Sequence, residues 1–111
     1  MSLQHIRYNA LYTLRKIFPK ETILEPISKS RKYNYYIKRT GETIKVLIAT
    51  IKDDHWEFRV AHNMVPEYFL LIALDNQERI VHQWILPREL LLDKGYHTMT
   101  ADSNPELKLP Y

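Results

Sequence analysis

The stretch that decides the fold is residues 29–50, "KSRKYNYYIKRTGETIKVLIAT". Its first half mixes tyrosines with basic residues, and its second half, from Ile44 onward, is mostly apolar. We expect a strand over 33–38, a turn in which Gly41 takes a positive φ, and a second strand over 44–51. Both faces of this second strand carry apolar side chains, so it should be a central strand that is covered on both faces.

The flanking sequence predicts the rest of the fold. Apolar residues recur at three- and four-residue steps over 3–18, which predicts a helix that ends before Pro19. Further strands are expected near 23–24 and over 56–60, 68–74, 79–86 and 97–100, with a short helix over 87–95. Short connections favour antiparallel pairing. The predicted class is α+β, an N-terminal helix packed on a mainly antiparallel sheet of four to five strands.

The alternation of apolar residues in these strands also predicts the core. The side chains expected to be buried are Val46, Ile48, Trp56, Phe58, Leu70, Ile72 and Ile85.

Length and composition predict one domain over residues 1–111. The chain has 111 residues, 45% of them apolar and 26% charged, and it has no cysteine. We expect residues 101–111, a polar segment with two prolines, to be a weakly structured tail. The longest apolar run, 69–74, is too short to span a bilayer, and no secretory signal is visible, so we expect a cytoplasmic protein without membrane contact.

The charge is unevenly distributed along the chain. Residues 1–52 carry eleven Lys and Arg against three acidic residues, a net charge of +8, whereas residues 53–111 carry five against ten, a net charge of −5. A basic half suggests an electropositive face, for which nucleic acid is a common partner. By period two, Tyr33 and Tyr35 face the core and Tyr36 faces outward, where it could stack on a base. The candidate nucleic-acid-binding residues are Lys29, Arg31, Lys32, Tyr36, Lys38 and Arg39.

Several kinds of site are disfavoured by the sequence. With only two glycines, no phosphate-binding loop can be written, and no serine lies in a nucleophile-elbow context. The segment 53–57, "DDHWE", matches no known spacing of metal ligands and is typical of a turn between strands. His82 is expected to pack beside Trp84. We expect no cofactor.

The order of elements resembles that of a known superfamily. The segments "KYNYYI", "IKVLIAT", "HWEFRV" and "EYFLLIALDNQERIVHQWILPRELL" are similar in arrangement to the restriction-endonuclease-like PD-(D/E)xK superfamily, in particular to its small group I intron homing nucleases. The likeness covers roughly residues 3–100 and includes Trp84, Ile85 and Pro87 of "WILP", which has one residue more before the proline than the relatives have. It implies a restriction-endonuclease-like fold and a partner that is nucleic acid, with DNA favoured over RNA.

The resemblance also implies a degenerate active site. It places Asn34 where the relatives have an acidic metal ligand, Leu47 where they have an acid or Gln, and Ala49 where they have Lys. Hard divalent cations prefer carboxylates, and neither leucine nor alanine can bind a metal or polarise a phosphate. We therefore expect no catalytic residues at these positions and no bound metal there.

Three functions follow from these observations. The first is a nucleic-acid-binding domain that has lost nuclease activity, so that the chain is not expected to be an enzyme. The second is a protein-interaction or structural module, whose basic hairpin meets an acidic partner or the acidic half of a second copy. The third is an active nuclease with relocated metal ligands such as Asp53, Asp54 or Glu57.

Overall fold

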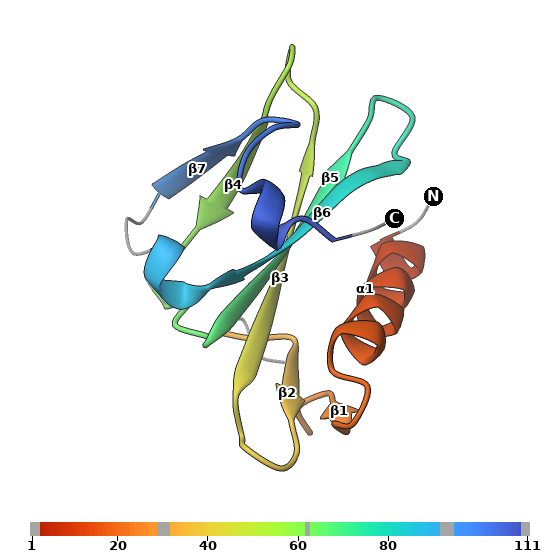
Figure 1. Ribbon diagram of the computed structural model, residues 1–111, viewed down its shortest axis with the longest axis vertical. Coiled ribbons are helices and arrows are strands. Elements are labelled where there is room, and N and C mark those ends of the chain that lie inside the picture. The colour runs from red at the N-terminus through yellow and green to blue at the C-terminus, as the bar shows by residue number, and fades with distance from the viewer. Residues whose placement is uncertain (1–2, 29–31, 62, 92–94, 110–111) are drawn as a thin grey trace.

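The computed structural model describes residues 3–28, 32–61, 63–91 and 95–109. Figure 1 shows one long helix beside a twisted sheet. In chain order the elements are α1 (Leu3–Ile17), β1 (Ile23–Leu24), β2 (Tyr35–Ile37), β3 (Thr43–Thr50), β4 (Trp56–Val60), β5 (Tyr68–Leu74), β6 (Ile80–Pro87), the 3-10 helix η1 (Arg88–Leu91), β7 (Gly95–Met99) and the 3-10 helix η2 (Pro105–Leu107).

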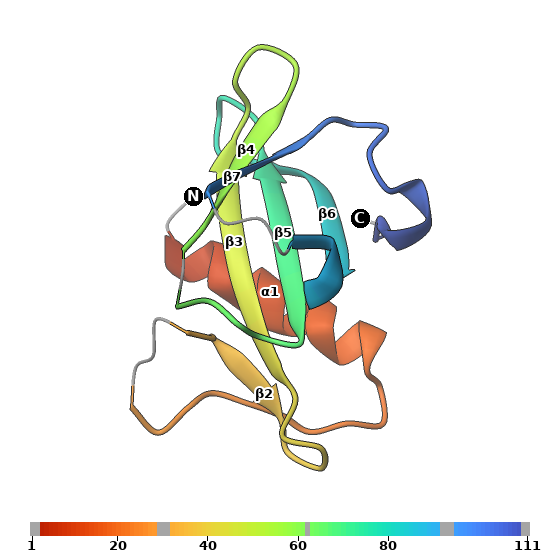
Figure 2. The ribbon, with the colours of Figure 1, turned by 90° about the vertical axis from the view of Figure 1, so that its left-hand side faces the viewer.

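The described elements form three layers. The middle layer is a five-stranded sheet of order β1-β2-β3-β5-β6, and β4 and β7 form a separate two-stranded ribbon. Helix α1 covers one face of the sheet, where Ile6, Ala10 and Leu14 meet the buried side chains of the strands. The ribbon covers the opposite face, where Trp56 and Phe58 pack against β3, β5 and β6 (Figures 1 and 2). Burial of apolar side chains on both faces of the sheet is the main stabilisation of this architecture.

Most pairings match the predicted α+β class. All pairs of neighbouring strands are antiparallel except β3 and β5, which are parallel from Ile44 opposite Tyr68 to Thr50 opposite Leu74. The parallel pair arises because β4 does not fold back along β3 as a sheet neighbour. It leaves the sheet after the turn at 52–55 and lies on the sheet face, where the Trp56 indole N–H donates a hydrogen bond to the Leu74 carbonyl over 2.9 Å.

The predicted core is partly correct. Trp56, Phe58, Leu70 and Ile72 are buried, but Val46, Ile48 and Ile85 are only half-buried. Val46 and Ile48 are only half-buried because β2 pairs with just the first two residues of β3. The rest of β3 has β5 on one side and no paired β2 residue on the other. Ile85 lies on β6, the outer strand at the other side of the sheet.

The C-terminal part differs in detail from the prediction. Of the helix expected over 87–95, the described residues contain one 3-10 turn, Arg88–Leu91, and residues 92–94 lie outside the described ranges. Pro87 still belongs to β6, where it pairs with Tyr68, and Gly95 already starts β7. Residues 101–109, for which the sequence predicts little structure, contain η2 and contact β6. The Trp84 indole donates to the Ser103 carbonyl over 2.8 Å, and the Leu109 N–H donates to the Gln83 carbonyl over 2.8 Å. Within the described ranges no helix is long and apolar enough to cross a bilayer.

Candidate nucleic-acid interface

Two of the basic residues singled out in the sequence, Lys38 and Arg39, lie at the turn between β2 and β3, whereas Lys32 precedes β2. The turn is closed by two backbone hydrogen bonds, from Gly41 to the Ile37 carbonyl (2.7 Å) and from Ile37 to the Glu42 carbonyl (2.8 Å), and Gly41 has the expected positive φ of 76°. Lys38 is exposed, and its backbone N–H donates to the Thr22 carbonyl, which ties the turn to the segment before β1. These bonds hold the backbone of Lys38 in a defined position at the end of the molecule.

Two of the other basic residues predicted to contact nucleic acid, Lys32 and Arg39, are also exposed. Lys29 and Arg31 lie outside the described residues, so their positions in the interface stay predictions.

Arg39 is engaged in an ion pair that the sequence does not reveal. Its guanidinium donates to both carboxylate oxygens of Glu21, from Nε over 3.0 and 3.2 Å, and its second nitrogen forms a further short contact with Oε1. The hydrogen bond from Arg39 lowers the pKa of Glu21, and the hydrogen bond to Glu21 raises the pKa of Arg39. Arg39 therefore already has an anionic partner, and a phosphate would have to compete with Glu21 for it.

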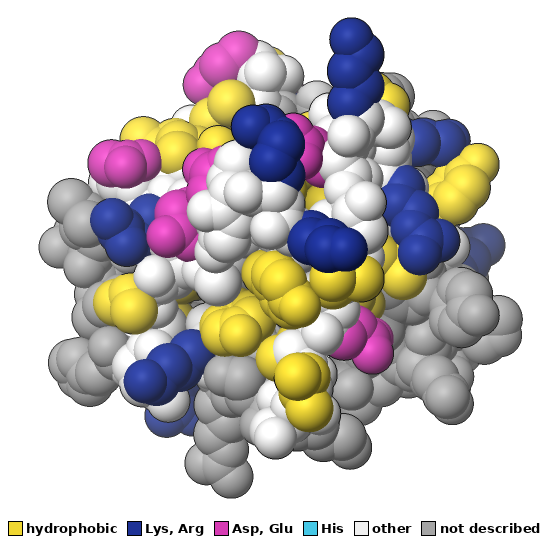
Figure 3. Space-filling view, turned by 90° about the horizontal axis from the view of Figure 1, so that it is seen from below, with side chains coloured by type: hydrophobic (Ala, Val, Ile, Leu, Met, Phe, Trp, Pro, Cys, Tyr) yellow, Lys and Arg dark blue, Asp and Glu magenta, His cyan; other side chains and the backbone are white. Residues whose placement is uncertain are grey.

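The end of the molecule that carries this turn is shown in Figure 3. Lys and Arg side chains stand around a central group of hydrophobic side chains, and Asp and Glu side chains lie between them. On this face the described Lys and Arg side chains therefore stand as separate cations with acidic neighbours. Cations arranged in this way can contact phosphates one at a time.

The tyrosines of this segment match the predicted alternation only in part. Tyr35 is buried at 3% exposure, as predicted, but Tyr33, expected to face the core, is half-buried like Tyr36. The rings of Tyr33 and Tyr36 contact each other edge to face, with centroids 6.4 Å apart. Tyr36 therefore offers part of its ring to solvent, while the rest is used in packing.

Asn34 holds the start of β3 through its side chain. Its backbone N–H donates to the Ile44 carbonyl over 2.9 Å, and its side-chain Oδ1 accepts the Val46 N–H over 2.7 Å. The side-chain carbonyl thus takes the place of a backbone carbonyl on a neighbouring strand. This is a structural use of the amide, which ties the segment before β2 to β3.

Leu47 and Ala49 are part of the core beneath the β4–β7 ribbon. They are 7% and 8% exposed and belong to the same apolar cluster as Trp56, Phe58 and Phe69. Neither position carries a titratable group. Elsewhere in the part of the chain that the structure describes, no group of three or more His, Asp or Glu side chains is arranged to hold a metal ion.

The segment "DDHWE" forms the expected turn. Asp53 has a positive φ of 60°, and Lys52 and His55 form a bridge across the turn. The His55 ring nitrogens lie 3.4 Å from Asp54 and 3.3 Å from Glu57, whose carboxylate is also 3.8 Å from the Lys52 ammonium. Asp54 and Glu57 therefore have local partners, and the three carboxylates do not converge on one point.

His82 packs among aromatic rings, as predicted. Its ring centroid lies 5.2 Å from that of Trp56 and 5.7 Å from that of Trp84. Burial and the positive charge of Lys108 lower the pKa of His82, which favours the neutral imidazole.

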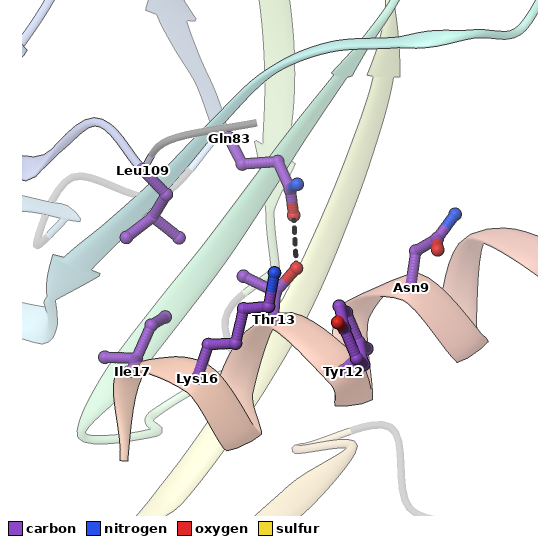
Figure 4. Close-up of a pocket in the computed structure, with 7 residues that line it drawn as sticks. All are labelled: Asn9, Tyr12, Thr13, Lys16, Ile17, Gln83 and Leu109. Atoms are coloured by element: carbon purple, nitrogen blue, oxygen red, sulfur yellow. Dashed lines mark hydrogen bonds between the residues drawn. The ribbon is translucent and has the colours of Figure 1, made fainter. Parts of the chain in front are cut away.

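The sequence analysis missed a pocket between α1, β6 and the C-terminal segment (Figure 4). Its volume is about 470 Å³, within the roughly 300–1,000 Å³ typical of small-molecule sites. Gln83, 2% exposed, forms part of its wall. The signal that could have indicated it is Gln83, a polar residue directly before the apolar run 84–86 of β6. The lining residues are Asn9, Tyr12, Thr13, Lys16, Ile17, Gln83 and Leu109.

Comparison with known proteins shows a similarity of fold but no match in sequence. No family model matches the chain, and no curated protein matches its sequence. Among solved structures, the bacterial homing endonuclease I-Ssp6803I superposes with a TM-score of 0.62 at 11% sequence identity, over 94% of this chain and 79% of the endonuclease chain. At this identity the likeness concerns the fold alone. The chain therefore has an α+β fold, a helix on a mainly antiparallel five-stranded sheet, that is similar to the fold of a homing endonuclease.

Proposed function

We propose that this chain is a nucleic-acid-binding domain of the PD-(D/E)xK type that no longer cleaves its substrate, with DNA favoured over RNA. The observation that carries the binding proposal is the turn between β2 and β3, where Lys38 is exposed on a backbone held by three hydrogen bonds. The likeness of the fold to a homing endonuclease supports the choice of nucleic acid as the partner.

The contacts proposed for this surface are electrostatic. Lysines on a rigid turn can approach phosphates without an ordering cost for the backbone, and each phosphate contact releases counterions. Lys38, on the turn, and Lys32, before β2, act as direct phosphate contacts. Arg39 acts as a third contact once it exchanges Glu21 for a phosphate.

The loss of cleavage is supported by the three positions that the resemblance identifies as the active site. The Asn34 oxygen is bonded to the Val46 N–H, and Leu47 and Ala49 are enclosed in an apolar cluster. Metal-assisted hydrolysis needs carboxylates that hold the ion and activate a water. Phosphate binding uses other residues and can remain when that chemistry is lost.

The binding proposal is tested by fluorescence anisotropy with a labelled DNA duplex, a single strand and an RNA over a series of salt concentrations. The double variant Lys32→Gln/Lys38→Gln should bind more weakly and reduce the magnitude of the salt slope by roughly 2. The control is Arg59→Gln, which removes an exposed charge from β4 and should leave the slope near that of the parent.

A second variant tests the ion pair of Arg39. Glu21→Gln removes the competing carboxylate and should strengthen binding several-fold at low salt. If the parent binds neither DNA nor RNA at low salt, the nucleic-acid proposal fails. Sedimentation of the parent would then show whether the basic and acidic halves of two copies associate.

Cleavage is tested with plasmid, duplex, branched and single-stranded DNA in Mg²⁺ or Mn²⁺. The parent should cut none of them, and a chelator should leave its DNA affinity unchanged. If the parent cuts and the triple variant Asp53→Ala/Asp54→Ala/Glu57→Ala does not, the metal site has moved to the turn and the proposed loss of activity is wrong.

A further inference from the structure

The pocket between α1 and β6 contains an unused hydrogen-bonding group. Gln83 is the one buried polar side chain in the described residues, at 2% exposure. One end of its amide contacts the Thr13 hydroxyl over 3.3 Å, and within the described ranges the other end has no hydrogen-bond partner. Either orientation of the amide leaves one polar end unused, because Thr13 can donate to the oxygen or accept from the nitrogen.

Gln83 lines the pocket, and we infer that the second polar atom of its amide faces it. This agrees with the absence, among the described residues, of any fully enclosed side-chain nitrogen or oxygen without a partner. Figure 4 shows the amide pointing from β6 towards Thr13 on α1. A buried amide that keeps one polar group for a cavity is suited to a ligand with a complementary edge, because an unpaired buried group is costly.

The other walls of the pocket define the rest of the ligand. Asn9, Thr13 and Lys16 follow one another at steps of three or four residues, so they lie on the same side of α1. Ile17 and Leu109 supply apolar surface, and the Tyr12 ring is 60% exposed. The Lys16 ammonium lies 4.5 Å from the centre of the Tyr12 ring, and both residues line the cavity. One cation, one aromatic ring and one buried amide therefore surround a mainly apolar space.

We propose that this pocket binds a single nucleotide, with the edge of the base at Gln83 and the phosphate at Lys16. A glutamine amide can both donate to and accept from the edge of a base, adenine being a common partner. The apolar side chains and the tyrosine would contact the flat faces of the base. Lys16 supplies the positive charge that the phosphate requires.

The nucleotide can come from solution or from a strand that presents an unpaired base, and both share the chemistry that the pocket recognises. The pocket is formed by α1, β6 and the C-terminal segment, whereas the proposed phosphate contacts Lys32 and Lys38 lie before and after β2. The two surfaces have no residue in common. The nucleotide site can therefore be correct or wrong independently of the proposed function.

The test is a calorimetric titration of the folded chain with adenosine monophosphate, adenosine and the other nucleoside monophosphates. Adenosine monophosphate should bind saturably. Lys16→Gln should weaken its binding about tenfold and leave adenosine unaffected, because the lost contact is to the phosphate. The matched control is Arg15→Gln, which removes the neighbouring exposed charge of α1 but does not line the pocket.

Gln83→Leu tests the base contact and should weaken adenosine monophosphate and adenosine by similar factors. If that variant does not fold, the Lys16 comparison still decides the question, because Lys16 is exposed and its replacement leaves the core intact. A labelled hairpin with one unpaired adenine, compared with a fully paired duplex, separates a nucleotide within a strand from a free one. The proposal is overturned if no nucleoside monophosphate binds at millimolar concentration, or if Lys16→Gln and Arg15→Gln weaken binding equally.

Discussion

Replacing Asn34 by alanine should destabilise the protein by about 1–2 kcal/mol. The change removes Oδ1, the acceptor for the Val46 N–H at 2.7 Å, and leaves that donor without its partner. An unsatisfied buried donor costs about 1–3 kcal/mol. Val46 is half-buried, so water can reach part of this edge, and the lower half of the range applies. The Asn34 backbone bond to Ile44 should remain.

The assay is urea unfolding of the parent, Asn34→Ala and Asn34→Asp at neutral pH. Aspartate keeps an oxygen acceptor in the same position, so it should retain most of the stability that alanine loses. In a domain of this size a loss of 1 kcal/mol lowers the melting temperature by about 4–8 °C, so the difference is also visible by thermal melting. Equal stability of parent and alanine variant would show that the side-chain bond contributes nothing. Equal losses in both variants would show that the amide nitrogen, not the oxygen, is what matters.

Three further predictions concern stability and metal binding. Phe58→Ala should lower the free energy of unfolding by about 3–5 kcal/mol because Phe58 is fully buried, and Ile48→Ala should lower it by at most about 2 kcal/mol because Ile48 is half-buried. Equal losses of both variants in chemical denaturation would contradict the observed burial. Burial raises the pKa of Glu67, but hydrogen bonds from the Thr43 hydroxyl and N–H, both 2.6 Å, outweigh it and hold the pKa below its ordinary value of 4.5. The stability from this carboxylate is therefore present above that value and lost as the pH falls through the folded pKa, so Glu67→Gln should be less stable than the parent at neutral pH and equal to it in acid. Finally, the triple variant N34D/L47E/A49K should gain Mg²⁺ or Mn²⁺ binding by calorimetry if these positions align with the superfamily's site, and a folded variant without metal binding would count against that alignment.

Regular elements could be predicted because they depend on local patterns. The three- and four-residue steps of the N-terminal segment predicted α1, and Pro19 ended it within two residues of the observed end at Ile17. Alternation predicted that Trp56 and Phe58 point to the core and Arg59 to solvent, as the structure has them. The Gly41 turn followed from the need for a positive φ, which glycine adopts at no steric cost.

For the candidate site, the sequence could predict which residue types take part but not how they are arranged in space. The sequence indicated Lys38 and Arg39 as neighbouring cations, and both are exposed. It could not indicate that Glu21, eighteen residues earlier, is the partner of Arg39, because that contact exists only once β1 lies beside β2. The Gln83 pocket likewise needs α1, β6 and the C-terminal segment to meet.

The sequence by itself determined α1 and the strands, their approximate ends and the apolar character of Leu47 and Ala49, but not the two 3-10 helices of the C-terminal part. Only the tertiary structure decided that β3 pairs in parallel with β5 and that β4 leaves the sheet to pair with β7. The physical reason is that period and propensity are properties of neighbouring residues, whereas strand order is set by which arrangement buries both apolar faces of the sheet at once. The half-burial of Val46 and Ile48 beside the short β2 could not be predicted for the same reason. The burial of a strand residue depends on which distant segment of the chain packs next to it.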